Sequence, residues 1–504
     1  MLAHALALAA VAVTTQADST YAFVGVSIIP MDRDRVLADQ TVVVRDDRIV
    51  ALGPSGMVDI PTNSIRIDGS GKYLMPGLAE MHAHIPGSRA AAEEVLFLYA
   101  AAGVTTIRGM LGEPLHLELR QQVANHQVLG PRIWTSSPSI NGNSVPTPAA
   151  ADSAVRASKD AGYDFLKIHP GPSRESFDQL VETAVAVDIT FSGHVPADVG
   201  IFRAIEARYA TIDHLDQYIE GLVSDDPPSA SLQGGFFGAS IAMHADQARI
   251  VELARMTKEA GVWNVPTQTL AVSYVTTESV ESMAQRPELS YIPARTRERW
   301  VEWKIEAGTS GPDAATMARY LELRNELIKA LHDVGAGLLL GSDAPQVWNV
   351  PGFSAWRELQ AVVDAGLTPF EALETGTVNV GRFFGVQSDL GTVSVGKKAD
   401  LILLNQNPLT GVDNVGVPAG VMLDGQWLSG DEIRARLETI AAKYGSRSPT
   451  RGTELGYPVV LEGCKYVIAS CGAPSQVTVT FSSLEPSGSI VWPVPSYAMA
   501  RQYR

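Results

Sequence analysis

Pro76-Gly77-Leu78-Ala79-Glu80-Met81-His82-Ala83-His84 is the most informative stretch of this chain. The Pro-Gly pair predicts a turn that ends the preceding strand, so a second strand begins at Leu78. His82 and His84 then lie two positions apart on that strand, where residues i and i+2 share one face. Two imidazoles held on one rigid face are half of a chelate for a divalent metal such as zinc. The stretch therefore predicts a strand that carries half of a metal site.

The composition indicates a globular protein with more than one domain. A chain of 504 residues exceeds a single minimal core, and 45% hydrophobic with 19% charged residues is typical of folded proteins. The net charge of −16 and the lack of a basic stripe argue against a nucleic-acid partner. No apolar run approaches the roughly 20 residues that a membrane-spanning helix needs. We therefore expect neither a nucleic-acid partner nor a membrane span.

The N-terminal residues have features of an export signal. Leu2 to Val13 is apolar and rich in Ala and Leu, and either Ala10-Val11-Ala12 or Thr15-Gln16-Ala17 offers the small residues that signal peptidase prefers. We expect residues 1–17 to be a signal peptide and the mature protein to be periplasmic or secreted. No Lys or Arg precedes the apolar run, which leaves a buried N-terminal helix as the alternative.

Cysteine chemistry plays no part in the predicted main fold. The two cysteines of the sequence, Cys464 and Cys471, stand near the C-terminus. Disulfides therefore do not build the main fold, and no thiolate is available there for a metal. Whether the two cysteines pair in an exported protein stays open. Both belong to the C-terminal tail 446–504, to which we assign no fold.

Strand-rich segments occupy both ends of the main fold. Residues 18–75 contain several apolar runs, two of which flank the tight turn Asp46-Asp47. Residues 386–445 contain similar runs. Because the two segments flank one α/β region, we expect them to assemble into one small β-sandwich domain.

The middle of the chain predicts an α/β barrel. Residues 76–385 alternate short apolar strands with amphipathic helical segments, which is typical of βα units. Eight such strands predict a (β/α)8 TIM barrel. The stretch from about 271 to 325 is longer than one connecting helix needs, and it predicts helices over the barrel mouth. After the strand that carries His82, the predicted strands are 104–108, 132–135, 165–169, 189–194, 209–214, 262–267 and 337–343.

Polar side chains stand at the ends of these strands, where barrel enzymes place their active sites. Each one alone has a structural explanation: a hydrogen-bonded histidine, a helix cap at Asp343, or a solvent-facing lysine at Lys167. Six of them on one rim are better explained by one shared site. His169 follows Lys167 by two positions and shares its face, where it either contacts substrate or packs at the rim. The six rim residues are His82, His84, Lys167, His194, His214 and Asp343.

At this point the sequence resembles the amidohydrolase superfamily of metal-dependent hydrolases, over residues about 20 to 440. It is most similar to the branch of imidazolonepropionase-like and Xaa-Pro or Xaa-Arg dipeptidase-like members. One departure is Arg108-Gly109-Met110, where an Arg-Asp pair is more usual. The marks of the resemblance are Pro76-Gly77-Leu78 before His82-Ala83-His84, Gly103-Val104-Thr105-Thr106, Gly130-Pro131-Arg132, Tyr163-Asp164-Phe165-Leu166-Lys167-Ile168, Gly193-His194-Val195-Pro196, Ile212-Asp213-His214-Leu215, Gly341-Ser342-Asp343-Ala344 and Gly396-Lys397-Lys398-Ala399-Asp400-Leu401.

The resemblance implies a role for each matching rim residue. It implies a first metal held by His82, His84 and Asp343, and a second held by His194 and His214. It also implies that CO₂ carboxylates the Lys167 amine, because a carbamate supplies two anionic oxygens that can bridge two metals. The two divalent ions, most commonly zinc, would share a hydroxide that attacks an amide carbonyl, with Asp343 moving the proton.

The implied activity is hydrolysis of a peptide-like amide bond in a small molecule, such as a dipeptide or an N-acyl amino acid. Two readings on the same fold stay open: a mononuclear cyclic-amide hydrolase or deaminase, and a non-catalytic assembly protein. Such deaminases carry a Glu three residues after a barrel histidine, whereas Ala197 and Gln217 occupy those positions here. The full ligand set argues against the assembly protein. Formation of a homo-oligomer is left open.

Overall fold

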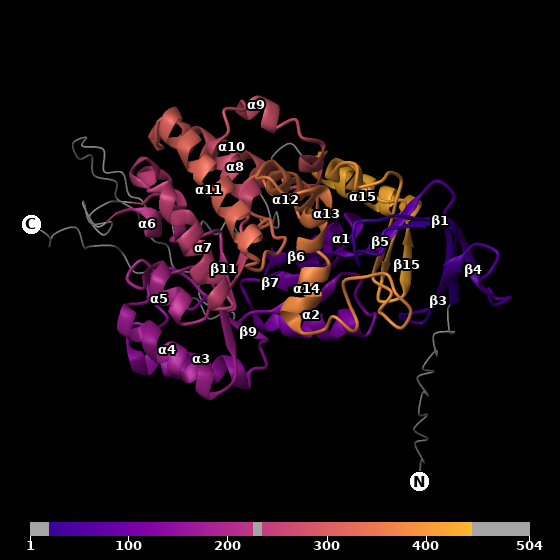
Figure 1. Cartoon of the computed structure of the whole chain (residues 1–504), viewed down its shortest axis with the longest axis horizontal. Helices are drawn as coiled ribbons and strands as arrows, with labels where there is room; N and C mark the ends of the chain where they lie inside the picture. The colour runs from indigo at the N-terminus through magenta and orange to yellow at the C-terminus, as the bar shows by residue number, and fades with distance from the viewer. Residues whose placement is uncertain (1–19, 225–233, 446–504) are drawn as a thin grey trace, which may run out of the picture. The chain divides into compact units, whose positions relative to one another are not determined.

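The computed structural model describes residues 20–224 and 234–445, which all belong to one compact unit (Figure 1). The predicted signal peptide 1–17, the tail 446–504 and both cysteines lie outside the described residues. Within these two described ranges, no helix combines the length and the apolar character that crossing a membrane requires.

Strands from both ends of the main fold form one hydrogen-bonded sheet. The N-terminal strands are β1 (Thr20–Ile28), β2 (Leu37–Arg45), β3 (Arg48–Pro54), β4 (Ile65–Asp68) and β5 (Tyr73–Pro76). The C-terminal strands are β13 (Leu401–Leu404), β14 (Gly420–Leu423) and β15 (Gln426–Ser429). The sheet order is β15-β14-β13-β5-β1-β2-β3, with β4 paired to β1. In Figure 1 the indigo N-terminal strands accordingly lie beside yellow β15.

The junction between the two ends explains why one sheet forms. Strand β5 pairs with β1 on one side and antiparallel with β13 on the other, with Leu74 opposite Leu403. Arg48, at the start of β3, also bridges to Lys398, shortly before β13. Both ends contribute strands as predicted, but their described strands all belong to a single sheet and not to two packed sheets. The predicted β-sandwich is therefore not confirmed.

The middle of the chain alternates parallel strands with helices. Strands β6 (Leu78–Ala83), β7 (Val104–Gly109) and β8 (Arg132–Thr135) form one parallel sheet. A second parallel sheet consists of β9 (Phe165–Ile168), β10 (Thr190–Gly193), β11 (Thr211–Asp213) and β12 (Trp263–Val265). An isolated parallel bridge between Ser136 and Phe165 links the end of β8 to β9.

The predicted last strand, 337–343, makes only isolated bridges. Asn264 of β12 bridges to Leu338, and Ala83 of β6 bridges to Ala344. Backbone hydrogen bonds run from Leu339 N to Asn264 O (2.9 Å) and from Asp343 N to His82 O (3.0 Å). The segment therefore lies between β12 and β6 without forming a regular strand, and it sets Asp343 beside His82.

Helices follow the strands as the βα pattern predicts. Thr147 and Ser173 cap α3 and α4, because each hydroxyl accepts a backbone N–H of the first turn. The helices among the first strands are α1 (Arg89–Ala101), α2 (Pro114–Ala124), α3 (Pro148–Asp160), α4 (Arg174–Ala186), α5 (Gly200–Glu206), α6 (Tyr218–Leu222) and α7 (Ile250–Glu259). The later ones are α8 (Gln268–Val275), α9 (Val280–Met283), α10 (Ala294–Ser310), α11 (Ala314–Val334), α12 (Phe353–Asp364), α13 (Pro369–Thr375), α14 (Val378–Phe384) and α15 (Gly430–Gly445). Short 3-10 turns occupy Phe236–His244, Gln247–Arg249, Pro287–Tyr291 and Val412–Val415.

The long stretch after β12 is helical, as predicted for 271–325. Helices α8, α9 and α10 and the first part of α11 fill it. Trp300 of α10 and Tyr320 and Leu323 of α11 are buried in the main core. The expected extra helices are therefore packed parts of the unit.

Candidate metal centre and active site

The fold brings all six predicted rim residues into one buried cluster. His82 lies in β6, Lys167 lies in β9, and His194 and His214 directly follow β10 and β11. Parallel strands end on the same side of a sheet, which explains why residues so far apart in the sequence meet. The exposed fraction of each of the six residues is 9% or less.

Asp343 lies between the two histidines of the first strand. Its Oδ1 is 2.8 Å from His84 Nε2 and 3.4 Å from His82 Nε2. One ligand atom each from His82, His214 and Asp343 lies within 4.8 Å of the others. Imidazole nitrogens and a carboxylate oxygen are the donors that zinc and similar divalent metals take. These three buried side chains could hold a metal ion.

The cluster continues toward the remaining predicted residues. The ring centroids are 4.4 Å apart for His82 and His214 and 4.6 Å apart for His214 and His194. Lys167 Nζ lies 3.5 Å from His82 Nε2. An ammonium group is no metal ligand, so the donor set is complete for a second ion only if the amine is modified or deprotonated.

His169 also reaches the cluster. Its ring centroid is 5.4 Å from that of His194, its Nδ1 lies 2.5 Å from Ser139 Oγ, and its exposed fraction is 3%. The residue is thus a buried neighbour of the centre and is not an exposed rim residue. Whether it contacts substrate stays a prediction.

Each of the three central histidines has a side-chain oxygen within 3.1 Å of its second ring nitrogen, and sequence reasoning missed all three of these oxygens. His214 Nδ1 is 2.9 Å from Thr267 Oγ1, and His194 Nδ1 is 3.1 Å from Asp216 Oδ2. His82 Nδ1 is 3.0 Å from Asp213 Oδ2, at an angle too oblique for a regular hydrogen bond. Such partners fix which nitrogen faces a metal. The run Asp213-His214-Leu215-Asp216 was the available signal, because both carboxylates flank a predicted ligand.

Burial favours the neutral form of His82 and His214. It lowers the pKa of His82 and His214 well below the usual range, and the neighbouring Lys167 and histidine charges lower both further. Burial raises the pKa of Asp216 to about 7. A neutral imidazole keeps a lone pair on one nitrogen, which is the form that binds a metal.

Arg108, the point where the sequence departs from its resemblance, is a buried part of this centre. Its Nε donates to Met81 O (2.7 Å), and its Nη2 donates to Thr211 Oγ1 (3.0 Å) and to Asp213 Oδ1 (3.2 Å). The partner carboxylate thus comes from β11 and not from the residue after Arg108. Arg108 thus holds the Met81 carbonyl that precedes His82, and Asp213 lies beside the imidazole of His82.

Aromatic side chains cover the second half of the cluster. The Phe237 ring stacks on His214 (4.9 Å, 17°) and on His194 (5.9 Å, 13°). Its φ of 47° is unusual for a bulky residue. The adjacent Phe236 stacks on Tyr274 of α8 at 4.1 Å. Nothing in the local sequence pattern distinguished these residues.

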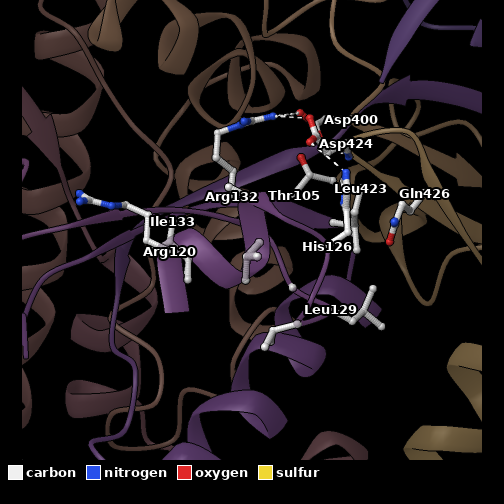
Figure 2. A pocket seen from close by; sticks show the side chains of 14 residues that line it. Thr105, Arg120, His126, Leu129, Arg132, Ile133, Asp400, Leu423, Asp424 and Gln426 are labelled. Carbon is white, nitrogen blue, oxygen red and sulfur yellow. Dashed lines mark hydrogen bonds and ion pairs between the residues drawn. The ribbon is translucent and has the colours of Figure 1, made fainter. Parts of the chain in front are cut away.

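A pocket lies at the N-terminal ends of β7 and β8, away from the strand ends that carry the predicted metal ligands (Figure 2). Thr105 and Arg132 line it from the beginnings of β7 and β8, Asp400 lines it from just before β13, and Asp424 lines it from the turn between β14 and β15. Arg132 Nη2 lies 3.1 Å from an oxygen of each aspartate. This charged joint ties the barrel region to the sheet and contains none of the predicted ligands.

Comparisons with known proteins identify the family to which the chain belongs. The model of the amidohydrolase family matches residues 73–428. Imidazolonepropionase of Rubrobacter xylanophilus is 24% identical over 408 residues, 73% of this chain and 85% of the relative. Bottromycin amidohydrolase superposes with a TM-score of 0.63 at 22% identity, over 84% of this chain and 91% of its own. A Xaa-Pro dipeptidase with bound methionine in the active site gives 0.59 at 19% identity, over 82% and 100%.

The chain belongs to the amidohydrolase family. Its structural neighbours imply the predicted TIM-barrel fold for the α/β region. The closed eight-stranded barrel is not confirmed, because the described strands of this region form one three-stranded and one four-stranded sheet. The protein is a metal-dependent hydrolase that acts on amide-type carbon–nitrogen bonds.

Proposed function

We propose that this protein is a binuclear metallohydrolase that cleaves the amide bond of a dipeptide or an N-acyl amino acid. The observation that carries the proposal is Lys167, whose fully buried Nζ lies 3.5 Å from His82 Nε2. Burying an ammonium group among imidazoles is costly, and an ammonium group cannot ligate a metal. Carboxylation would replace the ammonium group with a carbamate, which supplies two anionic oxygens as metal ligands.

The six residues divide into two sets in this proposal. His82, His84 and Asp343 would hold one ion, and His194 and His214 would hold the other. Carboxylated Lys167 would contribute a ligand oxygen to each ion. When bound, the two divalent ions, zinc in our proposal, would supply an activated water and polarise the amide carbonyl. Asp343, hydrogen-bonded to His84 at 2.8 Å, would take a proton from that water and deliver it to the leaving amine.

The substrate side of the proposal rests on the surroundings of the cluster. The apolar ring of Phe237 stacks on His214, Phe236 packs against Phe237, and polar groups are present at His169 and Ser139. A small, peptide-like molecule with one apolar side suits such a lining. The likeness to a Xaa-Pro dipeptidase supports this choice.

Hydrolysis of a cyclic amide with one metal is the second candidate function. The observation that favours it is the three-residue group His82, His214 and Asp343, which could hold one ion without Lys167. The sequence likeness to an imidazolonepropionase supports it as well.

A substrate screen with matched variants tests the proposal. Dipeptides, N-acyl amino acids and cyclic amides are offered to protein supplied with zinc and bicarbonate, in wild-type, Lys167→Ala and Lys159→Ala forms. Lys159 is an exposed lysine that donates to Asp188 O, so its variant controls for loss of a charge. We expect open-chain amides to be cleaved by all except Lys167→Ala. Cleavage of cyclic amides alone, undiminished in Lys167→Ala, would favour the second candidate.

The N-terminal residues carry a separate proposal. We propose that residues 1–17 direct export and are removed, which N-terminal sequencing of protein recovered from the native host tests.

A further inference from the structure

Arg324, on α11, is one of the largest fully buried side chains and lies directly behind His214. Its exposed fraction is 1%. A buried guanidinium must find acceptors for its five N–H groups, because an unpaired buried charge is strongly unfavourable. The acceptors of Arg324 therefore show which parts of the fold its guanidinium group holds in place.

Arg324 donates to two backbone carbonyls, each directly after a strand, and to the side chains of Gln268 and Tyr320. Nη1 donates to His214 O at 2.7 Å, and Nη2 donates to Pro266 O at 2.7 Å. Nε donates to Gln268 Oε1 at 2.8 Å. One planar group thus ties the residue after β11 to the segment after β12, in the fork geometry that a lysine cannot reproduce.

The backbone at both points is held in an unusual conformation. His214, Leu215 and Thr267 have φ values of 64°, 51° and 46°. Residues other than glycine adopt this left-handed region at a cost, and they stay there only when neighbouring contacts enforce it. The hydrogen bonds from Arg324 to the carbonyls of His214 and Pro266 are such contacts.

The same guanidinium also governs the imidazole of His214. Thr267 Oγ1 lies 2.9 Å from His214 Nδ1, and Thr267 directly follows Pro266. Arg324 therefore fixes the backbone that carries the ring and the backbone that carries the ring's partner. Displacing it would release the position and the tautomer of the imidazole together.

We infer that Arg324 is a positioning residue that holds His214 ready for metal binding. The inference rests on the proposed function, in which His214 is a ligand. Removing Arg324 is expected to weaken metal binding through His214 while His84 and Asp343 keep their 2.8 Å contact at the other side of the cluster. Loss of a residue that orients a ligand typically weakens metal affinity about 10- to 100-fold.

The experiment measures metal affinity and stability on the same preparations. Metal-free protein is titrated with zinc against a chromophoric chelator, in bicarbonate buffer, and its melting temperature is recorded without metal. The variants are Arg324→Met, Arg324→Lys and His214→Ala. The control is Lys304→Met, because Lys304 Nζ is also a largely buried cation that donates to carbonyls, those of Ser273, Tyr274 and Thr276.

We expect Arg324→Met to bind its weaker zinc equivalent about 10- to 100-fold less tightly, Arg324→Lys to fall between it and wild type, and Lys304→Met to bind as wild type. If Arg324→Met melts lower but binds zinc as tightly as wild type while His214→Ala does not, Arg324 is only a structural residue and the inference is wrong. If His214→Ala itself binds zinc like wild type, the proposed ligand set fails instead. Should Arg324→Met fail to fold, the affinity of Arg324→Lys against Lys304→Met decides.

Discussion

Replacing Asp213 with Asn removes the negative partner of a charge that is wholly inside the protein. Arg108 and Asp213 have side-chain exposures of 1% and 0%, and Arg108 Nη2 lies 3.2 Å from Asp213 Oδ1. Removing one member of a buried pair costs about 3–5 kcal/mol, because the other charge is left uncompensated. Arg108 keeps its hydrogen bonds to Met81 O and Thr211 Oγ1. We therefore expect the lower end, about 3 kcal/mol of unfolding free energy.

Urea unfolding of metal-free protein measures this cost, since bound metal would add stability by mass action. A double-mutant cycle with Arg108→Met measures the interaction energy of the pair. The double variant should lose clearly less unfolding free energy than the sum of the losses in the two single variants. The exposed pair Arg255 and Glu252, with side-chain exposures of 54% and 65%, is the control. Its coupling should stay below about 1 kcal/mol. An Asp213→Asn protein as stable as wild type would refute the reasoning.

Three further predictions concern Asp343, the proposed proton shuttle, the proposed bridging residue Lys167, and the buried acid Glu358. Asp343→Asn should lower kcat by about 10²–10⁴-fold with little change in KM, whereas a mere helix-capping role would change the melting temperature and spare turnover. Lys167→Ala should be inactive but partly rescued by short carboxylic acids with added metal, because their carboxylates can replace the carbamate oxygens. Near-wild-type turnover of Lys167→Ala would show that Lys167 is no metal ligand. Burial raises the pKa of Glu358 to about 7 from 4.5, so the folded state keeps a proton that the unfolded state has lost. The unfolding free energy should accordingly fall as the pH rises from about 4.5 to about 7, and urea titrations should show a smaller fall for Glu358→Gln; an unchanged slope would contradict the buried-acid assignment.

The cluster could be predicted from sequence because strand ends converge. His82, Lys167, His194 and His214 each end or follow an apolar strand, and parallel strands carry their ends to one side. Asp343 was found in the same way, although its segment forms isolated bridges only. The turn at Asp46-Asp47 was equally accessible, since β2 and β3 pair across it with Arg45 opposite Arg48.

The supporting residues could not be predicted, because their roles depend on side-chain directions between distant elements. Arg324 lies 110 positions from His214, in a helix whose pattern shows only that one face is buried. The predicted β-sandwich is not confirmed, for a related reason. The apolar runs of β5 and β13 indicate that both strands are buried, but they do not show that the two strands pair with each other in one sheet.

The metal content of protein supplied with zinc and bicarbonate tests the binuclear site most directly. Elemental analysis is combined with ¹³C NMR of protein equilibrated with ¹³C-bicarbonate, in wild type and Lys167→Ala. We predict close to two zinc ions per chain and a carbamate resonance that Lys167→Ala lacks. One zinc per chain, with no carbamate signal in the wild type, would contradict the two-metal site and leave the mononuclear function in its place.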